Sequence, residues 1–161
     1  MDGLYTKHIS GLENYVQEID KYPWSNELNR RTQHYGARYD YKSRSLIYDV
    51  QPLQGIVKSF NDEHLHVFGF NQCIVNEYRS GQKITPHIDH PKLFGNVIVS
   101  LSLGSSMIMR FTKNDRLFDV QLNHGDCLLI CNETRYQWKH ELLPVNDPNF
   151  RRISITYRTI L

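Results

Sequence analysis

The sequence has few cysteines and no long hydrophobic run, and each shortage excludes a class of protein. Its 161 residues include three cysteines, an odd number without a CxxC pair, so we expect neither a disulfide framework nor a cysteine zinc site. We interpret them as reduced thiols of an intracellular protein, in the cytoplasm or the nucleus. No run approaches the roughly 20 apolar residues that cross a bilayer, and the N-terminus lacks the pattern of a signal peptide. We therefore expect no contact with a membrane.

Neither sign of charge dominates. The net charge is +2, too small to indicate a nucleic-acid partner by itself. Hydrophobic residues make up 40%, which is ordinary for a globular protein. The chain is long enough to bury a core, and it shows no repeat, low-complexity tract or linker. We expect a single domain over residues 1–161, acting as a monomer.

Short segments of alternating apolar and polar residues dominate the second half of the chain. Turn residues such as Asn114–Asp115 and Gly125–Asp126 separate them, which is typical of β-sandwiches and barrels. The expected strands cover residues 97–104, 106–111, 117–122, 127–131 and 152–160. We expect Cys127 and Cys131, in an apolar run, to be buried. The pattern predicts a mainly β protein, a jelly roll (double-stranded β-helix), with bracing helices.

Two helices are expected before these strands. Apolar residues from Ile9 to Trp24 recur every three or four positions, which predicts one amphipathic helix. Ser10 is its expected N-cap, and Pro23 ends it. A second short helix is expected within residues 54–68.

The segment from Asn76 to Asp89 carries the first signal of chemistry. His87 and Asp89 are two residues apart, so in an extended segment their side chains point to the same side. A second histidine would complete a triad of two histidines and one carboxylate, which holds Fe(II) and leaves positions open for a co-substrate and dioxygen. We choose His140, on an expected late strand, over His124, which precedes a turn.

Two arginines on the last expected strand indicate a bound anion. Arg152 and Arg158 are six residues apart, so both point to one face of a strand. A buried arginine needs an anionic partner, and a guanidinium matches a carboxylate with two hydrogen bonds. Asn76 and Tyr78 also share a face. Together with Arg152, they could bind a dicarboxylate whose other end reaches the metal.

Residues 28–48 interleave basic and aromatic side chains. Arg30 and Arg31 could contact phosphates, and Tyr35 and Tyr39 could stack on bases. The alternative is a solvated edge hairpin whose tyrosines cover the core. The composition of the segment leaves both interpretations open.

With these motifs taken together, the sequence resembles the AlkB family of Fe(II)- and 2-oxoglutarate-dependent dioxygenases. The resemblance covers about residues 31 to 158, and the order of four motifs is far more specific than any one of them. The motifs are Asn76-x-Tyr78, His87-x-Asp89, His140 and Arg152-x5-Arg158. The segment 99–104 also resembles family members that act on transfer RNA.

The resemblance implies a role for each motif. His87, Asp89 and His140 would ligate Fe(II), while Asn76, Tyr78 and Arg152 would hold 2-oxoglutarate. Arg158 would line the site. Residues 1–48 would supply a helix and a nucleotide-recognition lid, and residues 49–161 the catalytic jelly roll. The partner would be single-stranded DNA or RNA, including transfer RNA.

The implied reaction is oxidative demethylation of N-alkylated bases, with release of formaldehyde. Two positions depart from the pattern of the bacterial enzyme: Ser154 replaces an asparagine, and Pro91 replaces an acidic residue that contacts the target base. The second departure leaves the base undefined. Alternatives are a hydroxylase of a modified transfer-RNA base or of a protein side chain, and a jelly roll that holds a metal without catalysis.

Overall fold

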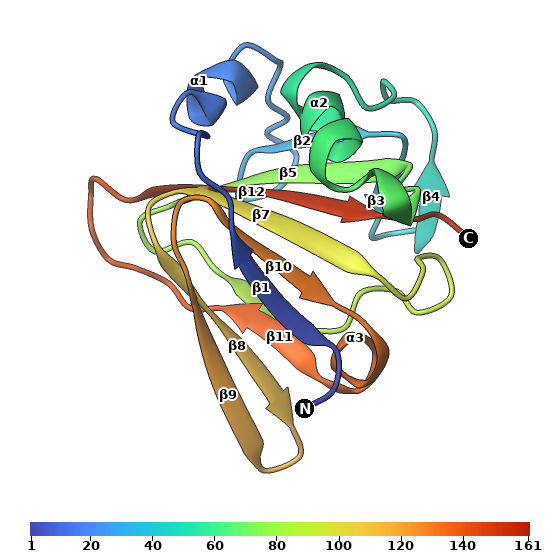
Figure 1. Cartoon of the computed structure of the whole chain (residues 1–161), viewed down its shortest axis with the longest axis vertical. Coiled ribbons are helices and arrows are strands. Elements are labelled where there is room, and N and C mark those ends of the chain that lie inside the picture. Colours follow the sequence, from blue (N-terminus) through green and yellow to red (C-terminus); the bar gives the residue numbers. More distant parts are fainter.

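Two β-sheets face each other in the computed structural model, which describes all residues 1–161 (Figure 1). The large sheet has the strand order β1-β10-β7-β12-β5-β2, and the small sheet has the order β6-β11-β8-β9. Strands β3 and β4 form a separate hairpin. The two facing sheets confirm the expected jelly-roll class.

The bounds of the elements agree with most of the predicted segments. The strands are β1 (Leu4–His8), β2 (Thr32–Tyr35), β3 (Arg38–Asp40), β4 (Ser45–Ile47), β5 (Gln72–Arg79), β6 (Ile84–His87), β7 (Ile98–Gly104), β8 (Met107–Lys113), β9 (Arg116–Leu122), β10 (Asp126–Ile130), β11 (Lys139–Leu142) and β12 (Arg151–Arg158). The helices are α1 (Tyr15–Ile19), α2 (Gly55–His64), a 3-10 turn at His66–Phe68, and α3 (Asn132–Gln137).

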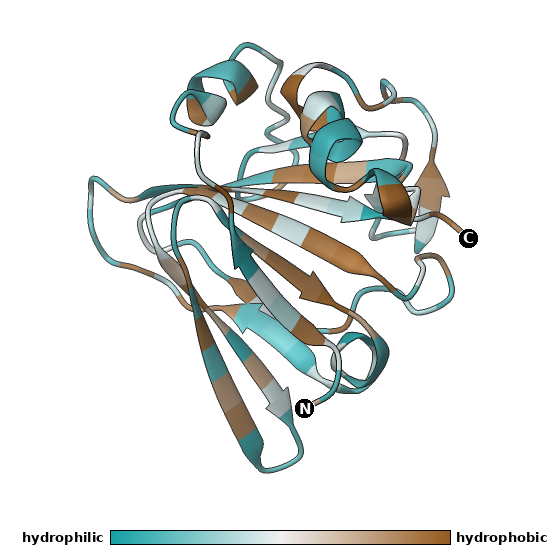
Figure 2. Cartoon of the chain, in the orientation of Figure 1, coloured by the Kyte–Doolittle hydropathy of each residue, from teal (hydrophilic) through white to brown (hydrophobic).

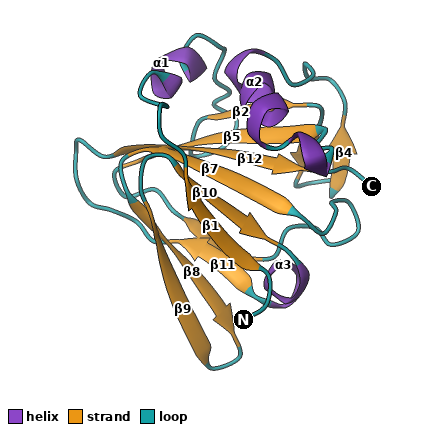
Figure 3. Ribbon diagram, in the orientation of Figure 1, coloured by secondary structure: helices purple, strands orange, loops and turns teal.

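The outer face of the large sheet is covered by α1 and α2 (Figure 3). Odd-numbered residues of β12, such as Ile153, Ile155 and Tyr157, lie on this face and pack against Ile19 of α1 and Phe60 of α2. Ile19 and Phe60 have no exposed surface. This apolar core braces the sheet, so the opposite face is left for the site.

The inner face of the large sheet looks toward the small sheet and divides into two parts. Around β10 it is apolar, and Leu128 there packs with Met107 and Phe111 of β8, from the small sheet, in a second core. Around β5 and β12 it carries polar side chains. In Figure 2, β7 and β10 of the large sheet are mostly hydrophobic, whereas β11 of the small sheet is largely hydrophilic. The polar part of the interior is therefore where a site can form.

The predicted helix over residues 9–24 is wrong in length, because α1 has five residues and begins after Asn14, not Ser10. Ile9 directly follows β1, and its N–H donates to the Gly125 carbonyl, while Gly11 has a left-handed φ of +81°. The apolar spacing correctly marked buried Leu12 and Ile19. The apolar spacing alone could not distinguish one long helix from what the segment contains, which is the end of a strand, then a glycine turn, then a short helix.

Two further features differ from the sequence expectations. Strand β1 pairs with β10 at the edge of the large sheet, although no strand was predicted there. Cys127 and Cys131 are half-buried rather than buried, and all three cysteines are free. No helix of the structure has the length and apolar character needed to cross a membrane.

Candidate metal centre and co-substrate site

His87, Asp89 and His140 come together although they lie up to 53 residues apart in the sequence. His87 ends β6 and is the ladder partner of His140 on β11, so the pairing of the two strands aligns the two imidazoles. One ligand atom from each of the three residues lies within 4.8 Å of the others. Nε2 of each histidine is 3.4 Å from Oδ1 of Asp89.

The hydrogen bonds of the triad aim its ligand atoms at one point. Nδ1 of His87 donates to the Thr85 carbonyl at 2.9 Å, which leaves Nε2 free to bind a metal. Nη1 of Arg158 donates to Oδ2 of Asp89 at 2.9 Å, which leaves Oδ1 toward the histidines. Two imidazole nitrogens and one carboxylate oxygen fit Fe(II).

Asp89 is held as a carboxylate. Burial alone would raise its pKa, but the hydrogen bonds to His140 and His87 and the charge of Arg158 outweigh burial and hold the pKa well below its usual range. The ligand is thus ionised at neutral pH, as metal binding requires.

Arg152 is the strongest sign of an anion site in the polar part of the interior. It has no exposed surface, and its Nε donates to Oγ of Ser102 at 2.8 Å. Its two terminal nitrogens, Nη1 and Nη2, are buried without a partner. Burial lowers the pKa of Arg152 to about 10, so the side chain stays a cation at neutral pH. A carboxylate is the group that satisfies both nitrogens at once.

The register of the large sheet places Arg152 in a polar row. Arg152 pairs with Tyr78 of β5 and with Gly104 of β7, while Ser154 pairs with Asn76 and with Ser102. The guanidinium of Arg152 lies 5.5 Å from the ring centre of Tyr78. The prediction that Asn76 and Tyr78 share a face with Arg152 and Arg158 is confirmed by this register. Ser154, the departure from the bacterial pattern, is buried in the same row.

Arg30 and Arg31 have separate partners. Nε of Arg30 donates to Oδ1 of Asn76 at 2.8 Å, and its guanidinium lies 6.0 Å from the Tyr78 ring. Arg30 is therefore next to the expected co-substrate residues, and its role toward phosphates stays a prediction.

Arg31 makes two hydrogen bonds to the carboxylate of Glu77. Because the guanidinium of Arg31 is already bound to the Glu77 carboxylate, the expected phosphate contact of Arg31 does not fit the structure.

Glu77 is the centre of a charge network on the outer face. It is 2% exposed and accepts hydrogen bonds from Arg31 and Arg151, while Arg151 also binds Asp20. Burial favours a raised pKa for Glu77, but these arginines outweigh it and lower the pKa. The network ties the segment before β2 to α1 and the large sheet.

This network predicts the acid limb of the stability curve. A depressed pKa means that Glu77 stabilises the fold above its unfolded pKa of about 4.3, and that this contribution is lost as pH falls through the lower folded value. We expect Glu77→Gln to lose about 3 kcal/mol at pH 7 and to approach the wild type near pH 2, as measured by urea unfolding. Glu13→Gln, at an exposed position, should match the wild type at pH 7, and a Glu77→Gln deficit independent of pH would contradict the assignment.

The two tyrosines expected to stack on bases lie in different places. Tyr35 is 4% exposed, and its hydroxyl donates to Gln33 in the core, so it has no free ring face and the expectation for Tyr35 is corrected. Tyr39 is on β3 and half-buried. Its ring meets the His90 ring edge-on at 6.1 Å, beside the metal ligand Asp89. Tyr39 therefore lies near the metal centre, and its stacking on a base stays a prediction.

A cavity of about 340 Å³ lies between β2 and the β3–β4 hairpin. Its lining includes Glu27, Leu28, Thr32, His34, Arg38, Tyr39, Asp40, Tyr41 and Lys42. Thr32 and His34 belong to the same face of the sheet as Asn76, since Thr32 is the ladder partner of Asn76. Nε2 of His34 lies 3.0 Å from the Thr32 hydroxyl, and Nδ1 is buried without a partner.

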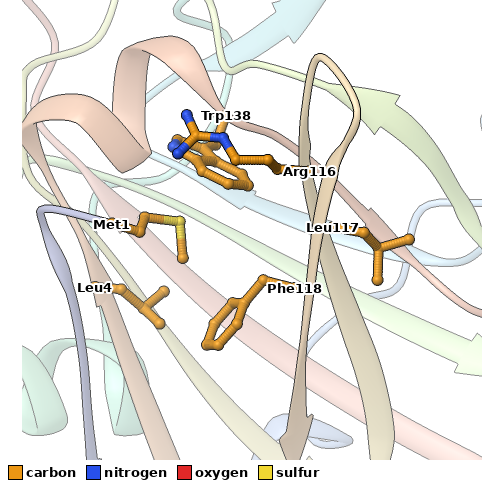
Figure 4. A pocket seen from close by; sticks show the side chains of 6 residues that line it. All are labelled: Met1, Leu4, Arg116, Leu117, Phe118 and Trp138. Atoms are coloured by element: carbon orange, nitrogen blue, oxygen red, sulfur yellow. The ribbon is translucent and has the colours of Figure 1, made fainter.

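A larger cavity of about 480 Å³ lies elsewhere, between the N-terminus and β9 (Figure 4). Met1, Leu4, Phe118 and Trp138 give it a mostly apolar lining, with the Arg116 guanidinium over the Trp138 ring at 5.0 Å. None of its residues belongs to the triad or to the polar row. Cavity size alone would therefore point to the wrong place.

Sequence reasoning missed several residues that shape the site. Ser102 and Gln72 support Arg152 and Arg158 by accepting hydrogen bonds at 2.8 Å each. Ser102 could have been found from its position, because Ser100 and Ser102 alternate with apolar residues along one strand, whereas this argument does not reach Gln72 on β5. Arg135, described below, carried no comparable signal. His124 accepts a hydrogen bond from the Gly104 N–H and is not part of the triad.

A jelly roll that holds two histidines and a carboxylate at its centre is the architecture of an iron-dependent oxygenase. The model of the 2OG-Fe(II) oxygenase superfamily matches residues 7–158. The chain belongs to this superfamily and, within it, to the AlkB-like oxygenases. It is therefore an enzyme that uses Fe(II), 2-oxoglutarate and dioxygen, with His87, Asp89 and His140 as its facial triad.

The relatives include viral and cellular proteins. An uncharacterised protein of Acanthamoeba polyphaga mimivirus is 30% identical over 91% of this chain and 77% of its own length. The tRNA (carboxymethyluridine(34)-5-O)-methyltransferase alkbh8 of Xenopus tropicalis is 30% identical over 78% of this chain, but the match spans only 22% of that protein. The DNA oxidative demethylase ALKBH2 of Bos taurus is 24% identical over 96% of this chain and 60% of its own length.

Solved structures confirm the fold. A 2OG-Fe(II) oxygenase-family oxidoreductase from Burkholderia pseudomallei has a TM-score of 0.65 at 14% identity, covering 97% of this chain and 83% of its own. A Pseudomonas putida prolyl-4-hydroxylase has a TM-score of 0.63 at 14% identity, covering 99% and 93%. At this identity the likeness concerns the fold alone.

Proposed function

We propose that this enzyme demethylates N-alkylated bases in single-stranded DNA or RNA and releases formaldehyde. The observation that carries the proposal is the cavity between β2 and the β3–β4 hairpin, where aromatic and basic side chains meet beside the triad. Relatives named as a DNA oxidative demethylase and as a DNA N6-methyl adenine demethylase support a nucleic-acid substrate.

Each group of site residues would have its own role in this reaction. When bound at the triad, Fe(II) with 2-oxoglutarate and dioxygen supplies oxidation of a C–H bond, giving succinate and carbon dioxide. Arg152 would hold the distal carboxylate of 2-oxoglutarate, with Tyr78 and Asn76 beside it. Arg158 donates to the second oxygen of Asp89, which would leave the first oxygen to bind Fe(II). Hydroxylation of an N-methyl group gives an N–CH₂OH product that breaks into the free N–H and formaldehyde.

The base would enter the cavity from a single strand or after flipping out of a duplex. Tyr39 would stack on it, and Arg30 would face a neighbouring phosphate, whereas Arg38 is paired with Asp49. His34 would offer its free Nδ1 to a polar atom of the base. Burial, then the nearby arginines, lowers the pKa of His34 to about 4, so the ring is neutral at pH 7 and can donate or accept there.

The stacking role of Tyr39 has a direct test. Base–aromatic stacking contributes about 1–3 kcal/mol, so Tyr39→Ala should raise the oligonucleotide KM by about 5- to 150-fold while the KM for 2-oxoglutarate stays unchanged. Tyr35→Phe is the matched control, because the Tyr35 ring is buried and loses only its bond to Gln33. Equal oligonucleotide KM values for Tyr39→Ala and wild type would remove Tyr39 from the substrate site.

The experiment on the function itself uses the Fe(II)-loaded enzyme with 2-oxoglutarate, oxygen and a panel of methylated single-stranded DNA and RNA oligonucleotides. We expect loss of a methyl group by mass spectrometry together with formaldehyde. Succinate formation without methyl loss on any oligonucleotide would contradict demethylation while leaving the oxygenase intact.

A second candidate is hydroxylation of a modified transfer-RNA base to a stable alcohol. Two observations favour it: Pro91 stands where the bacterial pattern has a base-contacting acid, and several relatives at about 30% identity are named as tRNA-modifying enzymes. A gain of one oxygen atom in mass, without formaldehyde, would separate this reaction from demethylation.

A further inference from the structure

Arg135 of α3 is a buried cation bound entirely to backbone carbonyls. It is 1% exposed. Its Nη1 donates to the Asp89 carbonyl at 2.8 Å and its Nε to the Gly95 carbonyl at 3.1 Å. Its Nη2 donates to the carbonyls of His90 and Phe94 at 3.2 Å each. One guanidinium thus holds both ends of the loop 89–95, which carries the metal-binding carboxylate.

The three metal ligands are held in different ways. His87 and His140 are opposite residues in a β-ladder, so strand pairing fixes their backbones relative to each other. Asp89 lies beyond the end of β6 and has no ladder partner. Its carboxylate is bound by Arg158, but Arg158 does not bind its backbone. The backbone carbonyl of Asp89 accepts one side-chain hydrogen bond, and its donor is Arg135.

The position of Arg135 in the chain links this loop to His140. Helix α3 ends at Gln137, and β11 with His140 begins two residues later. The start of α3 is also tied down, since Asn132 and Asn96 exchange two hydrogen bonds of 2.7 and 3.0 Å. A displacement of α3 would therefore move the Asp89 loop and the His140 strand relative to each other.

We propose that Arg135 is a positioning residue for the metal centre: it fixes the backbone of Asp89 at the distance from His140 that Fe(II) binding requires. A planar group with donors on three sides is needed, because the four carbonyls surround it. Lysine keeps the charge but offers donors from one point only, and it cannot reach all four carbonyls. A neutral side chain without donors would lose all four of these hydrogen bonds to the loop.

The test is metal binding without substrate, so its result is independent of which substrate is oxidised. The metal-free enzyme is titrated anaerobically with Fe(II), and with Co(II), whose visible absorption reports its ligand geometry. We expect Arg135→Lys to weaken both metals by about 10- to 100-fold, the range seen when a group that orients a metal ligand is changed, and to alter the Co(II) spectrum.

Arg151→Lys is the matched control, because Arg151 is also part of a hydrogen-bonded network but contacts Glu77 and Asp20 instead of the loop. It should lower the melting temperature without changing metal affinity. Metal affinity of Arg135→Lys within twofold of the wild type would overturn the proposal. If Arg135→Lys does not fold, Asn96→Ala decides: it loosens the start of α3, and we expect weaker metal binding from it, whereas unchanged affinity would overturn the proposal.

Discussion

Arg152→Met is expected to weaken 2-oxoglutarate binding by at least about 100-fold while Fe(II) affinity stays within twofold of the wild type. The reason is that Nη1 and Nη2 are buried without a protein partner, so a bound carboxylate would supply the hydrogen bonds they lack. Each hydrogen bond to a charged group contributes about 1.5–3 kcal/mol, and two of them exceed the roughly 2.8 kcal/mol that a 100-fold change requires. Co-substrate binding to the metal-loaded enzyme without oxygen measures this directly.

The same variant should be more stable than the wild type when 2-oxoglutarate is absent. A buried cation with one hydrogen bond, to Ser102, pays a desolvation cost that a methionine of similar length avoids. We expect the melting temperature of Arg152→Met without co-substrate to equal or exceed that of the wild type. The increase that 2-oxoglutarate causes in the wild type should disappear.

Two control variants show whether the effect is specific to the paired donors of Arg152. Arg110→Met removes an arginine that pairs with Asp119 on the small sheet, and it should leave co-substrate affinity unchanged. Arg152→Lys keeps the charge without the two parallel donors, so it should bind 2-oxoglutarate more weakly than wild type and more tightly than Arg152→Met. Undiminished co-substrate binding by Arg152→Met would show that the clamp lies elsewhere, and the unpaired nitrogens would then need another explanation.

The predictable part of the site rests on the two-residue period of strands. Asn76 with Tyr78, and Arg152 with Arg158, could be placed on one face from spacing alone, and the register of β5 and β12 confirms this. His87 and Asp89 also converge as predicted, although Asp89 lies just past the end of β6. Alternation holds wherever the chain is extended, so these inferences needed no tertiary information.

The unpredictable part depends on which face of a strand is buried, and against what. Residues 32–35 alternate as any strand does, but the sequence does not say that Thr32 and His34 face the site while Tyr35 faces the helices. The aromatic ring of Tyr35 therefore suggested stacking, although it fills the core. Arg31 offered a cation to phosphates, but its partner Glu77 is 46 residues away in the sequence and only the fold reveals the pair.

Replacement of a triad residue should have the largest effect on catalysis. We expect His140→Ala and Asp89→Ala each to lower turnover by at least about 1,000-fold and to abolish stoichiometric Fe(II) binding, since a lost ligand must cost more than the 10- to 100-fold of a lost orienting group. Anaerobic Fe(II) titration and succinate formation measure the two effects. His66→Ala, an exposed histidine outside the site, should match the wild type in both.

The two variants should differ in stability, which distinguishes loss of the metal from loss of the fold. In the metal-free protein the Asp89 carboxylate neutralises Arg158 and contacts both histidines. Asp89→Ala leaves Arg158 without its counter-charge, and removing one member of a buried pair costs about 3–5 kcal/mol. His140→Ala costs less, because it removes a single polar contact, from Nε2 to Asp89 at 3.4 Å, while Nδ1 has no hydrogen-bond partner to lose. Both enzymes should therefore be inactive, but only Asp89→Ala should melt well below the wild type without metal.

Stoichiometric Fe(II) binding by His140→Ala would contradict the assignment of His140 as the third ligand. His124 would then be the first histidine to replace in turn.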